Sequence, residues 1–220
     1  MIKAVLFDLD GTLANTLNDL GNAVNYVLEK YGYPTHPLES YKLKVGGGMR
    51  NLIHKSLPES EQNEETEQKV LAEFLEYYSK HFADETCCYE GISELLYKLK
   101  NMGMSLAVVT NKAQDMTDLV MQKLFESDTF NYIIGKREGI STKPDPESAF
   151  IAIDKLGVNS DECIFVGDSG VDMLTALNCG ALPVGVLWGF RSAEELKKSG
   201  CRFFLNEPDD LVKLIEAINL

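Results

Sequence analysis

Four short polar stretches contain the residue types that phosphate chemistry requires: residues 8–12, 110–111, 143–146 and 167–172. A carboxylate can serve as a covalent nucleophile, and the hydroxyl, amide and ammonium groups of the second and third stretches suit phosphate oxygens. The outer two stretches hold four of the carboxylates, Asp8, Asp10, Asp168 and Asp172. Such a cluster repels itself without a cation, and oxygen ligands with no nearby His or Cys suit Mg²⁺. Together these residues predict phosphoryl transfer through an aspartyl phosphate.

Taken singly, each stretch has an ordinary structural explanation. An Asp-x-Asp-Gly-Thr sequence after an apolar run is more often a turn or a helix cap than a nucleophile, because Asp, Gly and Thr favour turns on local grounds. Thr-Asn is by default a helix cap, Lys-Pro a loop and Gly-Asp-Ser-Gly a turn. The order and context of the whole set favour function over coincidence.

The elements predicted around these stretches would bring them together. Short apolar runs at 2–7, 105–109, 132–134, 163–166 and 182–186 predict buried strands. Helical spacings alternate with them at 113–125, 146–156, 172–179 and 193–199, and a last helix is predicted at 208–218. This alternation predicts an α/β fold with a doubly wound, mostly parallel, Rossmann-like sheet. Ligands bind at the carboxyl ends of such strands, so the four stretches should share one crevice.

The stretch between the first two predicted strands has a different character. It contains helical spacings, as at 17–28 and 70–82, and almost no strand pattern. Its acidic run at 59–67 is expected to be a solvated loop and helix start, because like charges usually face water. We therefore predict an α/β catalytic core formed by residues 1–14 and 85–220, and an all-helical cap domain formed by residues 15–84.

Composition limits the classes of function. The net charge of −13 argues against nucleic-acid or anionic-membrane binding, since both favour a basic face. No apolar run approaches the ~18 residues of a membrane span. The five cysteines are odd in number and form no C-x-x-C pair, and the apolar start is too short for a signal peptide, so we expect a cytoplasmic protein with reduced thiols. A monomer or a homodimer is expected.

The four stretches resemble the four motifs of the haloacid dehalogenase superfamily, and the resemblance covers essentially the whole chain. It implies that Asp8 is the nucleophile that becomes phosphorylated, and that Asp10 is the general acid that protonates the leaving oxygen and later activates water. It also implies that Thr110 and Asn111 bind the phosphate and that Lys143 steadies its charge. The implied Mg²⁺ site consists of Asp8, the backbone carbonyl of Asp10, and the acid pair Asp168 and Asp172.

Within the superfamily, the sequence is most similar to the phosphoglycolate phosphatases. The similarity lies in residues 7–13, 45–48, 143–146, 188–190 and 200–211. Asp10 favours a phosphate ester or anhydride, because dehalogenases and phosphonate-cleaving members generally lack an acid at that place. β-Phosphoglucomutases usually carry a His in the first cap helix, and residues 15–30 contain none. This disfavours a phosphomutase but leaves it as an alternative. An inorganic pyrophosphatase of similar build is a further alternative.

The cap is expected to supply specificity for a small phosphorylated metabolite, first of all 2-phosphoglycolate. The glycine-rich turn at 46–48 precedes Arg50, a planar cation that could meet a second anionic group such as a carboxylate. The turn would then act as a loop that closes over the site. A plain connection between two helices is the structural alternative.

Two classes without catalysis compete with the phosphatase. A phosphoacceptor receiver domain also uses acids, a Thr and a Lys on a doubly wound sheet, but it would be much shorter and would lack the helical insert. A non-catalytic binding module should have lost Asp8 or Asp10, and neither is lost. Turnover of p-nitrophenyl phosphate with Mg²⁺ separates an enzyme from both.

Overall fold

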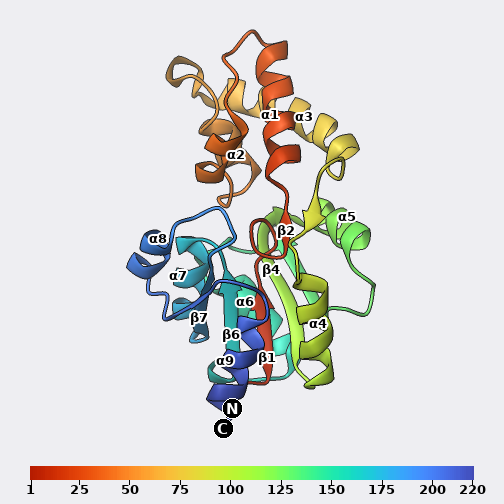
Figure 1. The fold of residues 1–220 in the computed structure, drawn as a ribbon. Helices are drawn as coiled ribbons and strands as arrows, with labels where there is room; N and C mark the ends of the chain where they lie inside the picture. Colours follow the sequence, from red (N-terminus) through yellow and green to blue (C-terminus); the bar gives the residue numbers. More distant parts are fainter.

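The computed structural model describes all residues from 1 to 220 and shows an α/β core with a helical unit above it (Figure 1). The core is built on one six-stranded sheet in the order β5-β4-β1-β6-β7-β8, and every neighbouring pair is parallel. The strands are β1 (Ala4–Phe7), β4 (Ser105–Ala113), β5 (Tyr132–Lys136), β6 (Cys163–Gly167), β7 (Leu182–Val186) and β8 (Phe203–Leu205). The predicted parallel α/β fold is confirmed.

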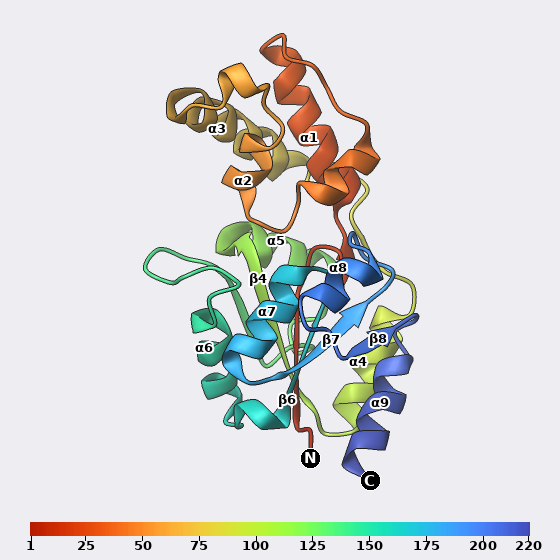
Figure 2. The ribbon, with the colours of Figure 1, turned by 90° about the vertical axis from the view of Figure 1, so that its left-hand side faces the viewer.

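Helices cover both faces of the sheet, and strand β1 shows why. Val5 and Phe7 belong to an apolar cluster on one face, whereas Ala4 and Leu6 belong to a cluster on the other, and none of the four is more than 1% exposed. A strand that is apolar throughout must be covered on both sides. One face carries α4 (Ile92–Asn101), α5 (Gln114–Leu124) and α9 (Asp210–Asn219). The other carries α6 (Glu147–Leu156) and α7 (Gly170–Cys179), with α8 (Ala193–Lys198) packed beside α7 (Figure 2).

Between the two very short strands β2 (Ala14–Asn15) and β3 (Cys87–Cys88) the chain is helical. The helices are α1 (Leu17–Lys30), α2 (Met49–His54) and α3 (Glu64–His81), with single 3₁₀ segments at Leu38–Leu43 and Glu59–Glu61. Helices α1 and α3 pack together around a separate apolar cluster, in which Tyr41, Phe74 and Tyr78 are 0% exposed. None of the helices in the chain has both the length and the apolar character that a membrane span requires.

The two passages of the chain between the core and the helical unit, which is the predicted cap, lie side by side. Strand β2 (Ala14–Asn15) pairs antiparallel with β3 (Cys87–Cys88). Next to them the Asp19 carboxylate of α1, which is 3% exposed, accepts hydrogen bonds from the backbone N–H groups of Glu85, at 3.0 and 3.1 Å, and of Thr86, at 2.8 Å. A buried carboxylate of the cap therefore fixes the returning chain beside the outgoing one.

The predicted end of the second strand is wrong. The prediction ended this strand at Val109, but β4 continues to Ala113, so Thr110 and Asn111 lie within the strand rather than in a loop after it. The register against β5 shifts between Val109 and Ala113, which marks the irregular part. Helix α4 and the short strands β2, β3 and β8 were not predicted; each of these strands has only two or three residues, too few for a periodic pattern.

Candidate active site

Asp8 is the first residue after β1, the strand that has β4 on one side and β6 on the other. It is 6% exposed. Its Oδ1 accepts a hydrogen bond from Lys143 Nζ at 2.9 Å and another from the backbone N–H of Leu9 at 2.7 Å, whereas its Oδ2 accepts none from the protein. One carboxylate oxygen is therefore fixed and the other is available to a ligand.

Asp168 follows β6, and its carboxylate is enclosed by backbone. Its Oδ2 accepts a hydrogen bond from the backbone N–H of Phe190 at 2.7 Å, whereas its Oδ1 has no protein donor. Gly11 and Gly189 approach so closely that a Cβ at either position would come within 2.3 Å and 2.2 Å, respectively, of Asp168 side-chain atoms. Gly11 also has φ +90°, a conformation that disfavours side chains. These positions require glycine because the chain passes directly over the carboxylate.

Asp172, in the first turn of α7, is 0% exposed and has both oxygens engaged. Its Oδ1 accepts a hydrogen bond from Lys143 Nζ at 2.7 Å. Its Oδ2 accepts hydrogen bonds from the Ser169 backbone N–H at 3.0 Å and from the Ser169 hydroxyl at 2.6 Å. This carboxylate holds the lysine and caps its own helix.

One oxygen from each of Asp8, Asp168 and Asp172 lies within 4.8 Å of the others. Burial, with the charge of Asp172, raises the pKa of Asp8 to about 7, although Lys143 acts in the opposite direction. Burial and the same mutual repulsion raise the pKa of Asp168 well above its ordinary value. For Lys143, burial acts to lower the pKa, but Asp172 and Asp8 outweigh it and raise the pKa. A cation would relieve this repulsion, and the hard oxygen donors fit Mg²⁺.

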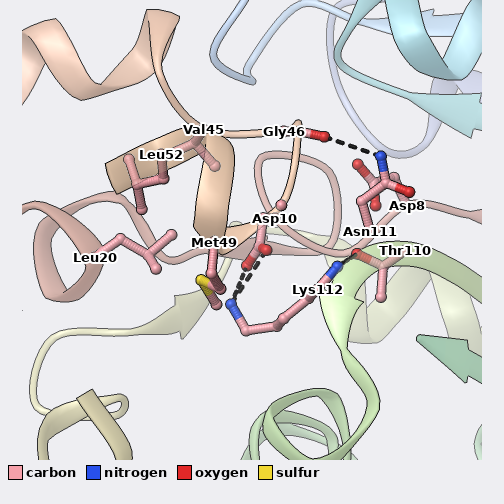
Figure 3. A pocket seen from close by; sticks show the side chains of 11 residues that line it. Asp8, Asp10, Leu20, Val45, Gly46, Met49, Leu52, Thr110, Asn111 and Lys112 are labelled. Carbon is pink, nitrogen blue, oxygen red and sulfur yellow. Dashed lines mark hydrogen bonds and ion pairs between the residues drawn. The ribbon is translucent and has the colours of Figure 1, made fainter. Parts of the chain in front are cut away.

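The two residues predicted to bind phosphate have different surroundings. Thr110 is 5% exposed and lines the pocket beside Asp8 (Figure 3). The Asn111 side chain instead exchanges hydrogen bonds with the backbone of Lys143, since Nδ2 donates to the carbonyl at 3.0 Å and Oδ1 accepts from the N–H at 2.8 Å. The same Nδ2 donates to the carbonyl of Gly46 at 3.2 Å. The Asn111 side chain therefore positions the lysine and contacts the cap.

Asp10 is paired with a lysine that the sequence analysis did not include. Both oxygens of Asp10 contact Lys112 Nζ, at 2.9 and 3.1 Å (Figure 3). Oδ1 also accepts a hydrogen bond from the Thr16 hydroxyl at 2.8 Å. The Lys112 side chain is 0% exposed. The signal available in the sequence was a cation that directly follows Thr110 and Asn111 at the end of a core strand.

The pocket between core and cap contains polar groups on one side and apolar groups on the other. The core contributes Asp8, Asp10, Thr110, Asn111 and Lys112. The cap contributes Leu20, Val45, Gly46, Gly48, Met49 and Leu52. A second core side chain holds the cap loop in place, because Arg191 Nη2 donates to the carbonyl of Val45 at 2.9 Å. A ligand in this pocket would therefore contact both parts of the chain.

The structure does not bring Arg50 into the pocket, although it brings Asp8, Asp10, Thr110 and Asn111 there. Its side chain is 55% exposed, with Nε 3.3 Å from Glu67 and Nη2 3.7 Å from Glu64, both on or at the start of α3. Met49 and Leu52 occupy the pocket face of α2. Residues one position apart on a helix point in different directions, so Arg50 faces away.

Comparison with known proteins agrees with this geometry. A family model described as haloacid dehalogenase-like hydrolase matches residues 5–186. A phosphoglycolate phosphatase of Pseudomonas savastanoi is 31% identical over 216 residues, which cover 97% of this chain and 78% of that protein. One of Neisseria meningitidis is 33% identical over 192 residues, covering 86% and 82%. A crystal structure from Lactobacillus delbrueckii has a TM-score of 0.91 at 30% identity and covers 97% of this chain and 98% of its own.

Proposed function

The chain belongs to the haloacid dehalogenase-like hydrolase family, and on that premise we propose that it is a Mg²⁺-dependent phosphatase that hydrolyses 2-phosphoglycolate through an aspartyl phosphate. The observation that carries the proposal is the Asp8 carboxylate, which has one oxygen fixed by two donors and the other free in the pocket that Thr110 lines. The substrate is taken from the curated relatives, which are named phosphoglycolate phosphatases.

In the first step, Asp8 Oδ2 attacks phosphorus and the bond from phosphorus to the leaving oxygen breaks. Lys143, within 2.9 Å of Asp8, offsets the repulsion between carboxylate and phosphate, and the Thr110 hydroxyl donates to a phosphate oxygen. Asp10 delivers the proton that the leaving oxygen needs. When bound by Asp8, Asp168 and the backbone carbonyl of Asp10, Mg²⁺ supplies further positive charge against the phosphate.

In the second step, the Asp10 carboxylate takes a proton from a water molecule, whose oxygen attacks the phosphorus. The bond between Asp8 and phosphorus breaks, which restores the Asp8 carboxylate and releases inorganic phosphate. Asp10 thus ends the cycle protonated, ready for the next leaving group. Its present contacts with Lys112 and Thr16 require its side chain to turn toward the substrate for both transfers.

We assign different roles to the two acids of the last motif. Asp168 keeps an oxygen without a protein donor and is assigned to the metal. Asp172 has three donors on its two oxygens and is assigned to the positioning of Lys143. All five cysteines are free thiols, which agrees with the cytoplasmic location that we propose.

The Asp8→Asn variant tests the covalent mechanism. Wild-type protein should release phosphate from 2-phosphoglycolate with Mg²⁺, should stop when EDTA is added, and should retain acid-stable phosphate on the protein when quenched. Asp8→Asn should show neither release nor labelling, because its amide is a poor nucleophile, while Asp154→Asn, on the exposed side of α6, should keep both. Substantial turnover by Asp8→Asn would contradict the mechanism, and hydrolysis of other phosphomonoesters alone would contradict only the substrate.

A further inference from the structure

Lys112 is a buried cation in the pocket with only one anionic partner. Its Nζ contacts both oxygens of Asp10, lies 5.2 Å from the ring centre of Tyr78 on cap helix α3, and makes no other ion pair. The side chain is 0% exposed, so the charge is removed from bulk solvent. Asp10 is therefore the only counter-ion of the Lys112 ammonium.

The partner of Lys112 is the residue that must move. Asp10 gives a proton to the leaving oxygen in the proposed reaction. In this structure, however, its two oxygens contact Lys112 and the Thr16 hydroxyl. When Asp10 carries the proton for the leaving oxygen and turns toward the substrate, the ammonium is left buried without its counter-ion. An unpaired buried charge is strongly unfavourable, so this movement requires a replacement anion.

Lys112 is the only cationic side chain that the pocket offers to an anionic substrate tail. Of the residues that line it, Lys112 is the only cation, and the side chains from the cap are apolar: Leu20, Val45, Met49 and Leu52. A carboxylate placed against those side chains alone would be buried without a partner, which is costly. Arg50, the cation expected for this purpose, lies outside the pocket on Glu67 and Glu64.

We propose that Lys112 is the specificity-determining residue of the site: its ammonium binds the carboxylate of the substrate when Asp10 turns from Lys112 to the leaving oxygen (Figure 3). The substrate class is a short phosphomonoester with a second anionic group close to the phosphate. The inference rests on the proposed phosphatase function and adds the residue that selects the substrate. A phosphomonoester with a neutral tail leaves the ammonium without a new partner and is the poorer substrate.

The test compares substrates that differ only in the charge of the tail. One pair is 2-phosphoglycolate and 2-hydroxyethyl phosphate, and the other is 3-phosphoglycerate and glycerol 3-phosphate. We expect Lys112→Met to lower kcat/KM for the carboxylated member of the preferred pair by about 10- to 150-fold more than for its neutral partner, the range for one charged hydrogen bond. Lys112→Arg should recover part of the preference. The control Lys123→Met, at an exposed position near the end of α5, should change neither substrate.

A binding measurement separates recognition from any effect on the chemistry. In the inactive Asp8→Asn background, calorimetry should show that Lys112→Met weakens binding of the carboxylated substrate while binding of inorganic phosphate is unchanged. Lys112→Gln, which keeps a hydrogen-bond donor, replaces Lys112→Met if the latter fails to fold.

Three results would overturn the inference. Equal losses of kcat/KM on both members of a pair would mean that Lys112 only supports Asp10. No loss on either member would mean that Lys112 does not contribute to the site. A wild-type enzyme without preference for a carboxylated member would refute the inference even if its phosphatase activity stands. Absence of phosphatase activity in the wild type would instead refute the proposed function.

Discussion

We expect Asp172→Ala to destabilise the fold far more than the loss of an ordinary surface carboxylate. The substitution removes the contact with Lys143 Nζ at 2.7 Å and the two hydrogen bonds from Ser169, at 3.0 and 2.6 Å. Lys143, whose side chain is 2% exposed, is then left with Asp8 alone. The first turn of α7 also loses half of its capping box.

The magnitude follows from these contacts. Removal of one partner from a buried ion pair costs about 3–5 kcal/mol, and loss of a helix-capping interaction costs about 1 kcal/mol. We take the lower end for the pair, because Lys143 retains Asp8 and because the repulsion between Asp172 and Asp8 disappears. The total is about 4 kcal/mol. Each kcal/mol lowers Tm by about 2–4 °C in a domain of this length, which gives a fall of roughly 8–16 °C.

Thermal unfolding followed by circular dichroism at pH 7, without metal, measures this effect. The matched control is Asp154→Ala, which removes an exposed carboxylate from α6 and should shift the free energy of unfolding by less than about 0.5 kcal/mol. The Mg²⁺ concentration for half-maximal activity should rise less in Asp172→Ala than in Asp168→Ala. A Tm of Asp172→Ala within 2 °C of the control, a margin of about 0.5–1 kcal/mol, would show that the ion pair does not stabilise the fold as argued.

Two other predictions concern the metal site. Gly11→Ala should abolish Mg²⁺-dependent activity and lower Tm, because its Cβ would lie 2.3 Å from Asp168 Oδ2. The control Gly103→Ala, also at positive φ but with no atom within 4 Å of its Cβ, should lower the free energy of unfolding by only about 1 kcal/mol. Equal Tm values for the two variants would contradict this prediction. Burial and the charge of Asp172 raise the pKa of Asp8 from 3.8 to about 7. Between these two pH values the folded state binds a proton that the unfolded state does not. The free energy of unfolding without Mg²⁺ should therefore fall as the pH rises through this window. Because Mg²⁺ binds the ionised carboxylates, it should raise Tm more at pH 8 than at pH 5, and an equal rise at both would refute the argument.

The sheet could be predicted because its strands are buried on both faces. Such strands appear as continuous apolar runs, and four of the five predicted strands end within two residues of the observed ones. Strand β4 is the exception, since its last four residues are Thr110, Asn111, Lys112 and Ala113. The polar residues Thr110, Asn111 and Lys112 interrupt the apolar pattern although the backbone continues in the strand. Helix α4 has apolar residues at 92, 95, 96 and 99, a helical spacing from which this element can also be predicted.

The meeting of the four motifs at one edge of the sheet could be predicted because each motif follows or ends a core strand, and parallel strands bring their carboxyl ends together. The contacts of individual side chains could not be predicted in this way. Asp168 and Asp172 are both buried carboxylates of one motif, yet only Asp172 has donors on both oxygens, because α7 begins at Gly170 and places Ser169 opposite it. The number of donors around each oxygen depends on that geometry and not on residue type.

Arg50 and Lys112 show that the sequence does not determine which cation faces the pocket. Arg50 follows a glycine turn, which made it the natural partner for a substrate carboxylate, but its direction is decided by two acids of α3 that are 14 and 17 residues away in the sequence. Lys112 follows the phosphate pair within a strand, where alternation of side chains sends it to the same side as Thr110 and away from Asn111. It reaches Asp10, 102 residues away, as a buried pair. On the proposed role of Lys112, specificity for a charged tail lies in the core, while the cap contributes the apolar side chains that face that charge across the pocket.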